Sequence, residues 1–166
     1  MSTITASVVL HNTPQSQIVR LLNCIRSSSI QLTTYVVDNS PSPLDYSCLR
    51  TPGITYRRET NRGYGAGHNS VIRAILDTSD FHFVLNPDIY FGPSELEPMI
   101  CFMEQNPDVG QLMPKILYPD GELQYLCKLL PTPANLFLRR FPSGILSDSI
   151  RRRNDQFELR FTGYNR

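Results

Sequence analysis

The sequence lacks tryptophan, a strong net charge and any long apolar run. Its 16 Lys and Arg nearly balance 15 Asp and Glu, and a net charge of +1 does not attract nucleic acid in general. No apolar stretch approaches the roughly 20 residues that span a bilayer. The first residues, MSTITASVVLHN, lack the basic region and long apolar stretch of a signal peptide. We therefore expect a cytoplasmic protein with no nucleic acid partner.

The four cysteines are few and far apart, and none belongs to a CxxC pair. This spacing does not match the ligand pattern of a zinc site. It is typical of reduced, mostly buried thiols in a cytoplasmic protein. These residues are Cys24, Cys48, Cys101 and Cys127.

Short apolar stretches of strand type alternate with stretches of helical spacing along the first part of the chain. The 166 residues, 40% of them hydrophobic, suffice for one domain with a sizeable core. Strands are expected at 4–10, 32–37, 54–57 and 81–85, and helices at 15–27, 71–76 and 93–104. This order predicts an α/β domain with a mainly parallel central sheet flanked by helices.

The pattern changes toward the C-terminus. Residues 109–118 look extended, and Pro119-Asp120-Gly121 is a strong turn signal. After about Leu130, prolines and arginines replace the apolar periodicity, and little regular core is expected beyond Phe141. We predict one domain over residues 1–126 and an irregular basic tail over residues 127–166.

Polar residues follow three of the predicted strands at the point where each strand ends. They are His11 and Asn12, then Asp38, Asn39 and Ser40, and finally Asn86, Pro87 and Asp88. In an open α/β sheet, the carboxyl ends of the strands form the ligand crevice. Turns that only join strands to helices are also polar, but three clusters on one edge favour a binding site.

The stretch NRGYGAGHNS, Asn61 to Ser70, has two interpretations. It could be a loop and helix start, with His68 to Ser70 in the first turn. Alternatively, its glycines would let the backbone approach a diphosphate that binds the helix N-terminus. The stretch does not match GxGxxG, because His68 occupies the place of the last glycine, and it lies after the wrong strand for a dinucleotide turn.

Two aspartates at strand ends leave similar alternatives open. Asp88, in LNPDI, is either a turn residue or a hard oxygen ligand for Mg²⁺ or Mn²⁺. Asp38 either caps the loop before Pro41 or accepts a hydrogen bond from a pyrimidine N3–H.

The segments VVLHN, VVDNS, NRGYGAGHN and LNPDI occur in this order and spacing. Together they resemble the family 2 glycosyltransferases, and most of all the bacterial rhamnosyltransferases that build O-antigen and related surface polysaccharides. The resemblance covers about Thr5 to Tyr125. It implies a GT-A fold and transfer of a sugar, with inversion, from a nucleotide diphosphate donor such as dTDP-rhamnose or a UDP-sugar to a lipid-linked saccharide.

The resemblance also implies roles for individual residues. Nucleotide-binding residues would be His11, Asn12, Asp38 and Asn39. The diphosphate and sugar would be bound by Asn61, Gly63, Gly65, Gly67, His68 and Asn69. Asp88 takes the place of the last aspartate of the family's DxD metal motif, whereas Asn86 replaces the first. A bound Mg²⁺ or Mn²⁺ would therefore depend on Asp88 alone.

The tail departs from the family pattern. Family members carry a further half with an acidic Glu/Asp-Asp motif, and no such motif follows Tyr125. Neither Asp148 nor Asp155 is assigned as the catalytic base. The sequence thus leaves two functions open, namely a glycosyltransferase or its donor-binding fragment, and an inactive nucleotide-sugar-binding or interaction module.

Two expectations concern partners. A missing acceptor-binding half would leave apolar surface exposed and favour a homo-oligomer. The arginines of the tail either form a solvated face or touch anionic lipid at the inner face of the membrane, which would make the protein peripheral. They are Arg139, Arg140, Arg151, Arg152 and Arg153.

Overall fold

The computed structural model describes residues 2–42, 47–133 and 147–162. The chain divides into two compact units, Met1–Gly110 and Gln111–Arg166. The boundary expected after Leu126 lies inside the second of these units. The predicted extent of the binding domain, residues 1–126, stays a prediction.

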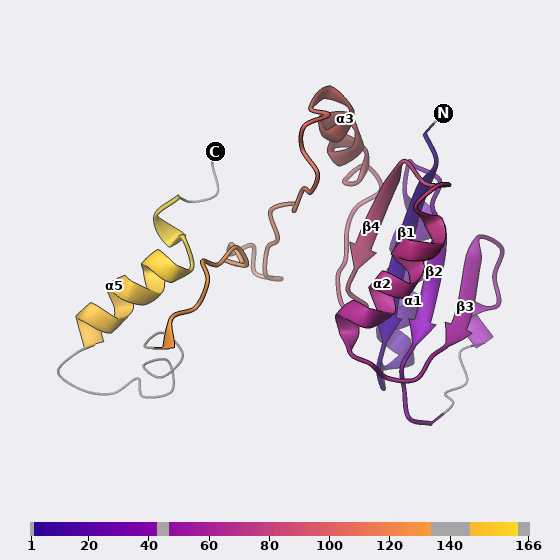
Figure 1. Cartoon of the computed structure of the whole chain (residues 1–166), viewed down its shortest axis with the longest axis horizontal. Coiled ribbons are helices and arrows are strands. Elements are labelled where there is room, and N and C mark those ends of the chain that lie inside the picture. The colour runs from indigo at the N-terminus through magenta and orange to yellow at the C-terminus, as the bar shows by residue number, and fades with distance from the viewer. Residues whose placement is uncertain (1, 43–46, 134–146, 163–166) are drawn as a thin grey trace. The chain divides into compact units, whose positions relative to one another are not determined.

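The first unit is built on a parallel sheet of four strands in the order β3-β2-β1-β4. The strands are β1 Ile4–Leu10, β2 Thr33–Asp38, β3 Ile54–Arg58 and β4 Phe81–Leu85. Leu10 pairs with Asp38, and Asp38 pairs with Arg58, so the three strands end at one edge (Figure 1). The predicted α/β class and parallel sheet are confirmed.

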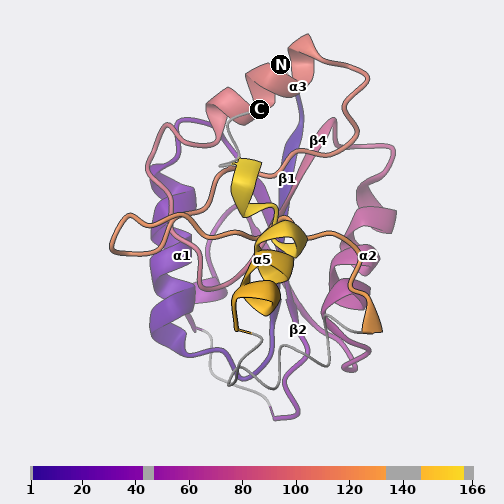
Figure 2. The ribbon, with the colours of Figure 1, turned by 90° about the vertical axis from the view of Figure 1, so that its left-hand side faces the viewer.

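Helices cover both faces of this sheet. Helix α1, Gln15–Ser27, lies on one face and helix α2, Tyr64–Ile75, on the other (Figure 2). Helix α3, Glu97–Gln105, follows β4 and has Pro98 in its first turn, where a missing N–H is tolerated. A short 3-10 helix, η1 Ser47–Leu49, precedes β3.

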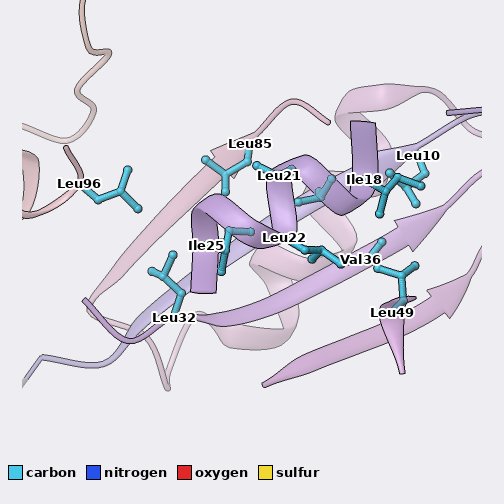
Figure 3. Close-up of a cluster of buried hydrophobic side chains, with 12 residues drawn as sticks. Leu10, Ile18, Leu21, Leu22, Ile25, Leu32, Val36, Leu49, Leu85 and Leu96 are labelled. Carbon is cyan, nitrogen blue, oxygen red and sulfur yellow. The ribbon is translucent and has the colours of Figure 1, made fainter. Parts of the chain in front are cut away.

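The larger core lies between α1 and the sheet. The four buried residues of α1, Ile18, Leu21, Leu22 and Ile25, recur at helical spacing and face the strands. Leu10, Val36 and Leu85 meet them from three strands (Figure 3). Full burial of each such side chain stabilises the fold by about 1.5–3 kcal/mol. A smaller cluster under α2 contains Val9, Val37, Val71 and Ile75.

Helix α2 begins earlier than the sequence predicted. We expected a loop through the glycines, with His68 in the first turn, but the helix starts at Tyr64. Gly63 precedes it with a φ of +99°, a backbone conformation that residues other than glycine rarely adopt. A Cβ on Gly67 would lie 2.8 Å from Val9 Cγ2. Gly67 therefore permits close helix–sheet packing, which composition alone does not reveal.

The second unit contains more regular structure than expected. Helix α5, Ser147–Phe157, and the 3-10 helix η2, Arg160–Thr162, lie in the tail predicted to be irregular. The Pro119–Gly121 turn is confirmed, since Gly121 donates to the Tyr118 carbonyl at 2.9 Å beside a Leu117–Leu123 bridge. The extended segment 109–118 forms no strand beyond that bridge. Lys128 and Glu158 form a 3.4 Å ion pair within this unit.

The expectation that the cysteines are mostly buried is wrong. Cys101 is exposed on α3, and the remaining three are partly exposed. The fully buried positions of the two clusters are held by other apolar residues, and Cys48 packs against the larger cluster.

We predict that Gly67→Ala destabilises the protein by about 1–3 kcal/mol, because the added methyl meets the stiff Val9 side chain. Gly65→Ala is the matched control, since nothing lies within 4 Å of a Cβ there. Alanine's higher helix propensity should leave Gly65→Ala neutral or up to about 1 kcal/mol more stable. Urea unfolding monitored by circular dichroism measures both. Equal free energies of unfolding for the two variants would contradict the packing role of Gly67.

Candidate functional site

A pocket opens where the strands of the first unit end. Its volume is about 470 Å³, within the usual range for small-molecule sites. The segments that line it follow β1, β2 and β3. The lining residues are His11, Asn39, Ser40, Pro41, Arg58, Glu59, Thr60 and Asn61. The structure thus brings together three residues predicted to bind a ligand, His11, Asn39 and Asn61.

The strand order brings the end of β4 next to the end of β1. From β1 the chain moves outward through β2 to β3, and then returns to place β4 on the other side of β1. The segment that follows β4 then runs along the α1 side of the sheet, where the Arg20 guanidinium lies over the Tyr90 ring and the Ser29 N–H donates to the Pro93 carbonyl at 2.8 Å. Asn86 and Asp88 follow β4, and the first turn of α2 lies at the same end of the sheet (Figure 1).

Asp38 lies beneath the pocket and is fully buried. Its Oδ1 accepts the Ser40 N–H at 2.9 Å, and its Oδ2 accepts the Tyr56 hydroxyl at 2.8 Å. The guanidinium of Arg58 lies 3.9 Å from Oδ2. These contacts satisfy a carboxylate that would be costly to bury alone. Asp38 organises the pocket wall, and the predicted direct contact with a base, which stays a prediction, would require these partners to move.

The segments after β1 and β2 are joined by hydrogen bonds. Nδ1 of His11 donates to the Asn39 carbonyl at 3.0 Å, and the Asn12 N–H donates to Ser40 Oγ at 2.9 Å. Asn12 has a φ of +51°, which asparagine tolerates better than most residues. The rim of the pocket is therefore held in place, with the exposed ring of His11 at its edge.

The first turn of α2 supplies hydrogen-bond donors near this edge. Asn61 Oδ1 accepts the Gly63 N–H at 2.9 Å, which shapes the chain just before the helix. No side chain caps the helix at Gly63. The backbone N–H groups of a first turn have no partner within the helix, and an anion at this position is favoured by them and by the helix dipole.

Tyr64 links α2 to the turn after β4. Its hydroxyl donates to Asn86 Oδ1. Burial and the negative charge of Asp88 both raise the pKa of Tyr64, so the phenol keeps its proton. The sequence analysis did not predict a role for Tyr64, because an aromatic residue among glycines does not indicate a binding site until the start of the helix is known.

His68 lies inside the protein, between α2 and the sheet. Its Nδ1 is 2.7 Å from Ser7 Oγ, which is also 2.7 Å from His82 Nε2. His82 Nδ1 lies 2.7 Å from Thr5 Oγ1, and these contacts form a chain of polar groups. Burial, and then the charge of His82, lowers the pKa of His68 to about 4. The predicted contact of His68 with a diphosphate stays a prediction. In the structure, His68 is buried and joins α2 to Ser7 on β1.

The other residues predicted to bind the diphosphate or sugar do not line this pocket. Gly63 and Gly65 are exposed at the start of α2, and Asn69 is exposed one turn later. Gly67 is buried against Val9. The sequence reasoning missed Arg58, Glu59 and Thr60, which line the pocket. Strand β3 ends at Arg58, one residue later than expected. Placing the end of β3 at Arg58 would have pointed to these three residues, because they are then the last residue of the strand and the two that follow it.

The donor set near Asp88 fits a divalent cation in part. A carboxylate is a suitable hard ligand, but Asn86 Oδ1 already accepts the Tyr64 hydroxyl. Among the residues that the structure describes, no group of three or more His, Cys, Asp and Glu could hold a metal. Asp88 would thus need oxygen ligands from a substrate and from water.

Within the described ranges, no helix has the length and apolar character needed to cross a membrane.

Comparisons with known proteins inform the fold. No family model matches the chain, and no curated protein matches it. Two solved structures of S. aureus TarS do, each with a TM-score of 0.52 and 15% identity over 70% of this chain. The chain spans 24% of one TarS structure and 40% of the other, which contains residues 1-349. The likeness shows that this chain has a GT-A-like α/β fold.

We predict that the stability of the protein falls as the pH drops from about 6.5 to 4. His68 takes up a proton near pH 6.5 when unfolded, but only at about pH 4 when folded. The unfolded state therefore binds more protons in this window, and stability is lost as the pH falls. The shift corresponds to roughly 3 kcal/mol at pH 4.

Chemical denaturation across this pH range tests the prediction with His68→Gln. Glutamine can still bond to Ser7 but does not titrate, so its free energy of unfolding should fall less steeply than that of the wild type. Parallel curves for the two proteins would show that His68 does not carry the pH dependence.

Proposed function

We propose that this chain is a glycosyltransferase or its donor-binding part, and that a nucleotide diphosphate sugar binds at the strand ends. The observation that carries this proposal is the pocket of about 470 Å³ at the carboxyl edge of a GT-A-like sheet. A nucleoside is of suitable size for such a pocket, and the helix start of α2 offers donors to its phosphates.

The pocket wall suits a nucleotide. Arg58 is half-exposed and donates to the Ser40 carbonyl at 3.0 Å, so its guanidinium is anchored at the pocket. Its planar face can stack on a base, and its charge favours a phosphate. His11 and Asn12 would meet the nucleoside, and Asp38 would act by holding Arg58 and Tyr56 in place.

The diphosphate would lie toward α2. Gly65 is exposed and has no neighbour within 4 Å of a Cβ position, so the backbone is accessible from outside. Asn61, Gly63 and Asn69 are exposed beside it. If Mg²⁺ or Mn²⁺ binds, Asp88 would hold it, and the cation would supply charge stabilisation for the departing diphosphate.

The finer specificity is proposed from sequence resemblance. The donor would be dTDP-rhamnose or a UDP-sugar, and the acceptor a lipid-linked saccharide of a surface polysaccharide. Transfer would proceed with inversion at the anomeric carbon. Asp148 and Asp155 remain unassigned as a base, and the side chain of Asp148 lies outside the described part of the structure.

A second candidate function is an inactive nucleotide-sugar-binding or interaction module. The observation that favours it is the length of the match, since the chain spans 24% and 40% of the two TarS structures. Measured sugar transfer or donor hydrolysis by the purified chain would exclude this alternative, whereas donor binding without turnover would support it.

We predict that calorimetry detects binding of dTDP-rhamnose or a UDP-sugar to the chain. Arg58→Met should weaken binding about tenfold or more, because it removes a charge-assisted contact but keeps the alkyl stem. Asp88→Ala should remove only the part of the affinity that depends on Mg²⁺. Arg26→Met, at an exposed position on α1, is the matched control for charge. A folded wild-type sample that binds none of these donors would overturn the proposed function.

We further propose that the protein acts in the cytoplasm, at the inner face of the membrane. Arg152 and Arg153 are exposed on α5, while Arg139 and Arg140 lie outside the described residues. Leu130 and Phe161 in the same unit are 93% and 75% exposed, which favours association with a membrane or a second copy.

We predict that the protein sediments with vesicles that contain anionic lipid more than with neutral ones, because arginine attracts anionic headgroups. Arg152→Gln/Arg153→Gln should reduce this preference. Equal sedimentation with both kinds of vesicle would contradict the membrane contact, and analytical ultracentrifugation without lipid would measure any homo-oligomer.

A further inference from the structure

Tyr64 is held at both ends. Its ring lies edge-on to that of His68, with 4.5 Å between the ring centres and 69° between the planes. His68 is itself anchored to Ser7 beneath the helix at 2.7 Å. At the other end, the Tyr64 hydroxyl donates to Asn86 Oδ1. The position of the Tyr64 ring thus relates the start of α2 to the turn that follows β4.

This contact determines which way the Asn86 amide faces. The side-chain amide is planar, so its oxygen and nitrogen point in different directions. When Oδ1 faces Tyr64, the NH₂ group points away from Tyr64. Asn86 is exposed, and within the described ranges its NH₂ group has no hydrogen-bond partner. Asn86 consequently offers two N–H donors to whatever binds there.

A phenol hydroxyl can donate to an amide oxygen or accept from an amide NH₂. In this structure the Tyr64 hydroxyl donates to Oδ1 of Asn86. The arrangement uses Oδ1, the atom of Asn86 that could ligate a cation, for a hydrogen bond within the protein.

We infer that Tyr64 is a positioning residue that turns Asn86 into a hydrogen-bond donor for the diphosphate of the ligand. Asp88 is then the carboxylate of this turn that would hold a cation. The inference deepens the proposed function and rests on it. It assigns opposite tasks to two residues of one turn, because an amide N–H stabilises phosphate oxygens directly and a carboxylate does so only through a cation.

The consequence is that part of the affinity for a nucleoside diphosphate is independent of metal. Calorimetry with UDP and dTDP in the presence of EDTA measures this part in the full chain. Tyr64→Phe keeps the ring against His68 but frees the amide, and should weaken metal-free binding about three- to tenfold, as expected for one hydrogen bond. Tyr90→Phe is the control and should not change it, because Tyr90 lies in the same segment and its ring packs on Arg20 instead.

Asn86→Asp replaces the NH₂ donor with a negatively charged acceptor and hardly changes the shape of the side chain. In EDTA it should lower the affinity for UDP by more than Tyr64→Phe does, since a carboxylate repels the diphosphate. In Mn²⁺ it should tighten binding of the cation in the presence of UDP, which electron paramagnetic resonance of free Mn²⁺ measures. Metal-free binding by Asn86→Asp as tight as that of the wild type would overturn the inference.

An NMR measurement on the ligand-free protein separates this inference from the proposed function. The side-chain NH₂ signals of Asn86, identified by their loss in Asn86→Asp, should shift in Tyr64→Phe and not in Tyr90→Phe. Unshifted signals would overturn the positioning role even if nucleotides bind. If the signals shift but Tyr64→Phe binds UDP and dTDP as tightly as the wild type does, the contact with the diphosphate would be refuted. A wild-type protein that binds no nucleotide would instead refute the proposed function.

Discussion

The close approach of α2 to β1 at Gly67 is the constraint on which the rest of the site depends. A side chain at this position would collide with Val9, whose methyl groups would lie 2.8 and 3.1 Å from the Cβ. With glycine there, the helix lies low on the sheet and its first turn reaches the strand ends. Tyr64 can then contact Asn86, and His68 can reach Ser7 on β1.

The same close packing explains why polar groups are buried next to the site. His68, Ser7 and Asp38 are each at most 3% exposed, yet each has a hydrogen-bond partner at 2.7 to 2.9 Å. For the atoms that they join, such pairs avoid the roughly 1–3 kcal/mol that an unsatisfied buried polar group costs. Nε2 of His68 is an exception, since it is buried and has no hydrogen-bond partner among the described residues. These pairs hold the strand ends and the start of α2 in one arrangement, so a ligand that binds there, as proposed, would not first have to order them.

Much of the fold was predictable from local pattern. Ile4–Leu10 and Phe81–Leu85 are short apolar runs, and Ile18, Leu21, Leu22 and Ile25 have helical spacing, so these elements were confirmed within a residue or so. The polar ends of the strands predicted a binding site at the edge of the sheet where the pocket of the structure lies. Helix α5 was missed because charged residues dominate its sequence. Its contacts with Lys128 and Leu129, which both involve Phe157, come from a segment distant in sequence.

The order of residues by itself determined the class of the fold, the edge at which a ligand would bind and the region in which its donors would lie. Those properties follow from periodicity and from the polarity of strand ends, which are local. Only the tertiary structure decided which of these side chains lie at the pocket and which lie inside the protein. His68 and Asp38 lie inside because a helix and three strands surround them, and Asn86 presents its NH₂ group because Tyr64, 22 residues away, takes its oxygen. Such assignments depend on distances between segments, and no spacing along the chain specifies them.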